Sequence, residues 1–124
     1  MEVDGNMKYI GNITSDPKQN IKLILDDGSR VDFTLEYRPM QEGWFYSFTW
    51  GTYSVNNKRL VTSPNMLRYF RNIFSFGFAC ITTDGAEPIY QDDFVNGRAQ
   101  FYLLNAEDVL AAEVKILNFD ERLA

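Results

Sequence analysis

Apolar and polar residues alternate with a period of two along much of this chain, which is the pattern of β-strands that bury one face. Segments 19–25 and 30–38 show it most clearly, since each carries large apolar side chains at alternate positions. The Asp27-Gly28 pair between them tolerates the positive φ angles that tight hairpin turns require. We therefore predict a β-hairpin over residues 19–38.

The densest aromatic stretch is 43–51, which carries five aromatic rings between two glycines. Alternate side chains of a strand share a face, so four of these rings lie together: Trp44, Tyr46, Phe48 and Trp50. Each aromatic side chain has about 150–250 Å² of surface that the fold or a partner must cover. We predict a central strand whose rings form the core. The alternative is that part of this face is an assembly surface.

The other predicted strands are shorter and are bounded by turn residues. They are an irregular edge strand within 7–13, two strands joined by a tight Asn56-Asn57 turn within 52–62, and single strands at 73–83, 98–104 and 113–119. Gly77 inside one of them indicates a bulge or a close approach of another segment. Segment 64–72 breaks the alternation, and Pro64 suits the first position of a helix, so we predict one short helix or helical loop there. A brief helical turn is expected within 105–112.

These elements indicate a mainly β protein, either an antiparallel β-sandwich or a small β-barrel with one short helix. The length of 124 residues fits a single β-rich domain over 1–124. Within it we expect an N-terminal edge segment at 1–18 and a C-terminal turn and strand at 105–124.

The sequence offers little for catalysis. It contains no histidine, which removes the commonest general base and the commonest transition-metal ligand. Its single cysteine, Cys80, lies in an apolar run and is expected to be a buried, inert thiol without a disulfide. The carboxylates of Asp26-Asp27 and Asp92-Asp93 are expected to be turn residues, because neighbours on an extended chain point to opposite faces. We expect no enzyme, no cofactor and no metal site.

The charge balance also excludes some partners. Twelve Lys and Arg against seventeen Asp and Glu give a net charge of −5, so the chain as a whole repels phosphate backbones. No apolar run approaches the length of a membrane span, and the acidic N-terminal residues differ from a signal peptide. We expect a soluble intracellular product that binds neither nucleic acid nor membrane. A single-stranded nucleic-acid-binding β-barrel stays as an alternative, because aromatics exposed on strands between basic residues stack bases.

The order of motifs from residue 19 to 104 resembles the small baseplate plug proteins of contractile-tailed phages. After the hairpin, the matching stretches are Trp44-Phe45, Arg59–Leu67, Phe76-Gly77-Phe78, Asp84–Pro88, Asp92–Arg98 and Phe101–Leu104. The resemblance implies a non-enzymatic structural component of the virion, at or near the central hub of the tail baseplate. Its implied partners are tube, spike or wedge proteins, in a symmetric assembly of multiple copies. A head–tail adaptor of similar size is a further alternative.

Arginines and loop carboxylates are the best candidates for such contacts, because arginine is enriched in interface hot spots and loops carry more contacts than strands. The predicted interface residues are Arg59, Arg68, Arg71, Asp92, Asp93 and Arg98.

Overall fold

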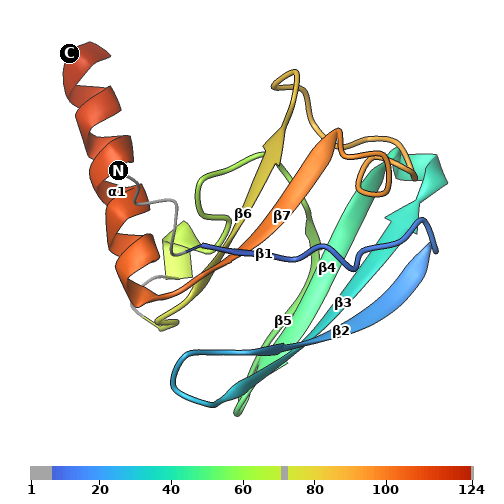
Figure 1. Cartoon of the computed structure of the whole chain (residues 1–124), viewed down its shortest axis with the longest axis horizontal. Coiled ribbons are helices and arrows are strands. Elements are labelled where there is room, and N and C mark those ends of the chain that lie inside the picture. Colours follow the sequence, from blue (N-terminus) through green and yellow to red (C-terminus); the bar gives the residue numbers. More distant parts are fainter. Residues whose placement is uncertain (1–6, 71–72, 124) are drawn as a thin grey trace.

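The computed structural model describes residues 7–70 and 73–123, and only the backbone over 115–123. It contains two antiparallel sheets packed face to face (Figure 1). One sheet has the order β1-β7-β6, formed by Lys8–Tyr9, Ala99–Leu104 and Gly77–Thr82. The other has the order β2-β3-β4-β5, formed by Lys18–Ile24, Arg30–Arg38, Gly43–Trp50 and Tyr53–Arg59. No strand pairing joins the two sheets in the described residues, so the sandwich, rather than the closed barrel, is the observed fold.

The predicted hairpin is confirmed as β2 and β3, which pair antiparallel with Ile21 opposite Phe33 and Leu23 opposite Val31. Gly28 in the turn has a φ of 89°, a conformation in which a Cβ would be strained. The predicted edge strand is also confirmed, because the two-residue β1 pairs only with β7 at the edge of its sheet.

Strand β4 supplies the centre of the core, as its aromatic pattern predicted. Trp44, Tyr46 and Phe48 are at most 4% exposed, and Trp50 is partly buried. Phe48 packs edge-on against Phe78 of the opposite sheet, with ring centroids 5.5 Å apart. Burial of each such ring is worth about 1.5–3 kcal/mol, so this face holds the two sheets together.

The predicted turn at Asn56-Asn57 is wrong, because both residues lie within the continuous strand β5. The register passes from Tyr46 opposite Lys58 to Phe48 opposite Val55, which leaves one extra residue on β5. Asn57 takes a φ of 56°, and its N–H donates to the Ser47 hydroxyl at 2.9 Å. Asparagine does adopt a positive φ at this position, as the predicted turn required, but the conformation belongs to a β-bulge within β5.

The predicted strand at 113–119 is also wrong, since Ala106–Leu123 forms the helix α1. Its start has a reciprocal cap, in which the Asp108 N–H donates to Asn105 Oδ1 at 2.8 Å. The Asn105 N–H donates in turn to Asp108 Oδ2 at 3.1 Å. This arrangement satisfies two backbone N–H donors at the N-terminal end of the helix. The acidic side chains of the first turn also interact favourably with the helix dipole. Figure 1 shows α1 on the side of the three-stranded sheet, where Val109 packs with Leu104 and Ala79.

Segment 64–82 is less regular than predicted. In residues 64–70 the expected short helix is a 3-10 turn, η3, at Arg68–Phe70, while positions 71 and 72 of that prediction lie outside the described residues. Strand β6 begins at Gly77. Phe74 and Phe76 precede the strand in a loop, yet both are buried in the core. Gly77 does mark a close approach, because a Cβ there would collide with the Asn65 side chain, whose oxygen accepts the Leu67 N–H.

Candidate protein-interaction site

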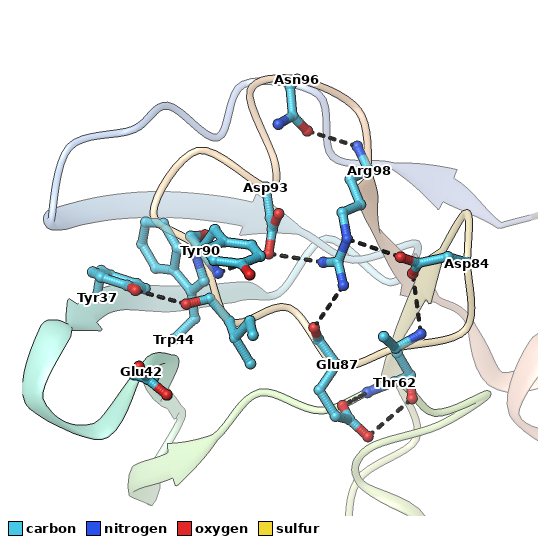
Figure 2. Close-up of polar contacts among 12 residues, drawn as sticks. Tyr37, Glu42, Trp44, Thr62, Asp84, Glu87, Tyr90, Asp93, Asn96 and Arg98 are labelled. Carbon is cyan, nitrogen blue, oxygen red and sulfur yellow. Dashed lines mark hydrogen bonds and ion pairs between the residues drawn. The ribbon is translucent and has the colours of Figure 1, made fainter.

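The long loop 83–98 between β6 and β7 is organised by one arginine (Figure 2). Arg98 donates from Nη1 to Asp93 Oδ2 at 2.9 Å and from Nε to Asp84 Oδ2 at 3.3 Å. Its Nη2 donates to the Glu87 carbonyl at 3.1 Å. The planar guanidinium has several donors in a fixed geometry, so one side chain joins three points of the loop.

Asp93 lies inside the molecule. It is only 1% exposed, and its Oδ2 also accepts the Tyr90 N–H at 2.8 Å. The Arg98 side chain, 18% exposed, closes the solvent side of this pair. The two predicted interface residues Asp93 and Arg98 are therefore brought together, and they shape the loop from within.

Two core aromatics fix the loop to the four-stranded sheet. The Tyr37 hydroxyl donates to the Ile89 carbonyl at 2.6 Å, and Trp44 Nε1 donates to the Tyr90 carbonyl at 3.2 Å (Figure 2). Burial, assisted by the nearby acidic side chains, raises the pKa of Tyr37, so its phenol remains a donor. These two hydrogen bonds hold positions 89 and 90 of the loop to strands β3 and β4.

The outer side of the loop presents other side chains to solvent. Tyr90 is 58% exposed, Val95 is 56% exposed, and Asp92 is exposed beside them. The Arg98 guanidinium lies 5.9 Å from the Tyr90 ring centre. Asp92 is thus the member of the predicted loop set that faces solvent, two residues after Tyr90 and three before Val95.

Arg59 occupies a different place, on the outer face of the four-stranded sheet. Its guanidinium donates to the Gln41 carbonyl at 2.7 Å and lies 4.9 Å from the Phe45 ring centre. Arg38 approaches the same ring to 4.3 Å. Gly43 makes room for this arrangement, because a Cβ there would collide with the Arg59 guanidinium. Two cations over one aromatic ring form a compact cluster through cation–π attraction.

Arg68 is directed toward helix α1. Its Nε and Nη2 contact the two carboxylate oxygens of Glu113 at 2.9 and 3.0 Å, a bidentate pair with both side chains largely covered. This contact ties η3 to α1. Arg71, the remaining predicted interface residue, lies outside the described residues. The predicted set therefore occupies three separate environments: the loop 83–98, the Phe45 cluster and the α1 contact.

Sequence reasoning did not include Phe45, Arg38 or Tyr90 among the interface candidates. Alternation did place Phe45 on the opposite face of β4 from the core rings. That position was the signal that one aromatic side chain would face outward. The proximity of Arg38 and Arg59 to it depends on strand pairing, which a single sequence does not state.

The predicted buried thiol of Cys80 is confirmed, since the residue is buried and forms no disulfide. Burial raises the pKa of Cys80 to about 12, which keeps the thiol protonated and unreactive at neutral pH. Among the described side chains, which extend to residue 114 of the described ranges 7–70 and 73–123, no group of three or more Asp, Glu or Cys is arranged to hold a metal ion. Within the same ranges, no helix has both the length and the apolar character of a membrane span.

Comparison with known proteins gives one family. The model of the family described as cyanophage baseplate Pam3 plug gp18 matches residues 7–107. A search of curated proteins returned no match. The matched region spans both sheets and the loop 83–98.

Proposed function

We propose that this chain, which belongs to the family of the cyanophage baseplate Pam3 plug gp18, is a non-enzymatic structural component at or near the central hub of a phage tail baseplate. Membership implies a structural role in the virion tail baseplate and association with other tail proteins. The proposal adds that its partners are tube, spike or wedge proteins. It also adds that several copies enter a symmetric assembly.

The observation that carries this proposal is the extent of the family match, which covers the whole sandwich. The structure adds physical support, because the exposed side of the loop 83–98 is held rigid by Arg98, Tyr37 and Trp44. A preorganised loop loses little conformational entropy on docking. Exposed Tyr90, Val95 and Asp92 are then the contacts we assign to this loop, while Asp93 and Arg98 position them.

The nucleic-acid alternative has less support. It required strand aromatics exposed between basic residues. Trp44, Tyr46 and Phe48 of β4 are buried in the core, and the outward-facing ring of Phe45 is half-buried against Arg38 and Arg59. The head–tail adaptor alternative is of the same functional class and differs in its location within the particle. Location is therefore the quantity to measure.

The test is to locate an epitope-tagged copy of the chain in purified virions by antibody labelling and electron microscopy. Label at the tail tip is expected, and a cryo-EM difference map against particles lacking the chain should show density beside the central axis. Label at the head–tail junction would contradict the proposal and favour the adaptor. Virions without any copy of the chain would contradict both structural roles.

A further inference from the structure

The outer face of the four-stranded sheet is basic, although the protein is acidic. Cross-strand neighbours share a face, and the register of β2, β3, β4 and β5 places five cations on the solvent side: Lys18, Lys22, Arg30, Arg38 and Arg59. Two carboxylates, Asp32 and Glu36, lie among them. Hereafter these residues, with Phe45, are called the basic face.

The charge of the basic face differs in sign from that of the whole chain. Five Lys and Arg against two carboxylates give the basic face a net charge of +3. The rest of the chain holds the other seven Lys and Arg and the other fifteen Asp and Glu, a net charge of −8. The outer face of the four-stranded sheet is therefore locally positive within an acidic chain, which favours the approach of an acidic partner to this face.

Part of the positive charge is not used inside the fold. Arg30 pairs with Asp32 at 3.3 Å, and Arg38 pairs with Glu36 at 3.0 Å. Lys18 and Lys22 are exposed and lie opposite Glu36 and Asp32 in the β2–β3 register, but in the described part of the chain neither lysine forms an ion pair within 4.0 Å, because Glu36 and Asp32 pair with Arg38 and Arg30 instead. These two lysines point from β2, an edge strand, into solvent. Their charge is available to a partner.

The basic face also has an apolar anchor. Phe45 is half-buried between the guanidiniums of Arg38 and Arg59, and Ile24 is 53% exposed on the same side of β2. Arginine stacked on an aromatic ring retains in-plane N–H donors that match a carboxylate. Figure 1 shows α1 beside the other sheet, so this helix does not cover the basic face.

From these observations we infer that the basic face docks an acidic surface of a neighbouring baseplate protein, with carboxylates over Lys18, Lys22 and the Phe45 cluster. The inference rests on the proposed function and adds the surface and the chemistry of the partner. Asp32 and Glu36 favour a protein over a nucleic acid, because they interrupt the cations where a continuous phosphate backbone would lie. The half-covered ring of Phe45 is likewise flanked by guanidiniums and is poorly placed for base stacking.

The experiment measures association of the whole chain with each purified baseplate protein of the same particle by biolayer interferometry, at low and at physiological ionic strength. The test variant is Lys18→Gln/Lys22→Gln, which lowers the net charge of the face from +3 to +1 and places no acidic side chain opposite Glu36 or Asp32. The matched control is Lys8→Gln, an exposed lysine on strand β1 of the other sheet. Equal melting temperatures establish that all three proteins keep the fold. Poly-L-glutamate and a duplex oligonucleotide are titrated separately into isotope-labelled protein and followed by NMR.

We expect one baseplate protein to bind, with an association rate that falls about tenfold in the double variant at low salt and is unchanged in Lys8→Gln. Poly-L-glutamate should shift the amide signals of β2 and β4. Full-strength binding by the double variant would overturn the basic-face inference and leave the proposed function standing. Tighter binding of the duplex than of poly-L-glutamate at this face would overturn the inference in favour of nucleic acid. Absence of binding to every baseplate protein, with virion label at the head–tail junction, would overturn both.

Discussion

Replacing Arg98 with methionine tests whether the loop 83–98 is built on its buried ion pair. The substitution keeps a long apolar side chain but removes the donors to Asp93, Asp84 and the Glu87 carbonyl. The Asp93 carboxylate, 1% exposed, then keeps the hydrogen bond from the Tyr90 N–H but loses its ion pair. A buried charge that loses its partner keeps its desolvation penalty without the compensating attraction.

The expected loss follows from that burial. Removing one partner of a buried pair costs about 3–5 kcal/mol, which is a large share of the roughly 5–15 kcal/mol stability of a typical domain. The matched control is Arg30→Met, which breaks the exposed pair with Asp32, whose side chains are 55% and 49% accessible. An exposed pair of this kind is worth less than about 1 kcal/mol.

Asp93→Asn completes a double-mutant cycle. The amide oxygen of asparagine can still accept the Tyr90 N–H, while the buried negative charge is gone. In Arg98→Met/Asp93→Asn no charge is left uncompensated, so the double variant should lose less stability than the sum of the two single variants, by about 2 kcal/mol.

Urea unfolding followed by tryptophan fluorescence is a suitable assay, since Trp44 is fully buried and bonded to the loop through the Tyr90 carbonyl. The free energy of unfolding is compared for wild type, both single variants, the double variant and Arg30→Met. Equal losses in Arg98→Met and Arg30→Met, or strict additivity in the cycle, would refute the reasoning that this pair organises the loop.

Three further predictions follow from individual contacts. Gly77→Ala should cost about 1–3 kcal/mol by collision with Asn65, and less in an Asn65→Ala background; equal costs in urea unfolding would contradict this. Burial raises the pKa of Tyr46 and of Cys80 to about 12, so the contribution of these neutral side chains to folding stability is full below about pH 9 and is lost as the pH rises through 12. Tyr46→Phe should therefore reduce the loss of unfolding free energy at alkaline pH by roughly 3 kcal/mol in urea titrations, and an unchanged pH profile would contradict the assignment. Arg68→Ala should speed amide hydrogen exchange of α1, at a cost of about 1–2 kcal/mol, whereas unchanged exchange would mean that α1 docks without this pair.

The elements that the sequence predicted well are those whose pattern is local. The hairpin at 19–38 and the aromatic strand β4 each combine alternation with defined turn residues, and both appear with the expected buried face. The failures lie where local patterns are ambiguous. In 113–119 a few apolar residues fit either period, and the signal that selects the helix is the Asn105 and Asp108 cap upstream.

Interface residues are hard to predict from sequence because an arginine satisfies internal carbonyls and carboxylates as readily as those of a partner. Arg98 and Arg68 are of this kind: each forms charge-assisted contacts that hold one segment of this chain to another. Composition identifies such arginines as candidates, but only the folded structure shows which acceptors their N–H groups contact. The surface left for assembly is then defined by what the internal pairs do not use, namely the charge of Lys18 and Lys22 and the exposed ring of Tyr90. On this argument, substitutions at Arg98 and Arg68 would affect assembly through the folded structure, whereas substitutions at the two lysines would affect it at constant stability.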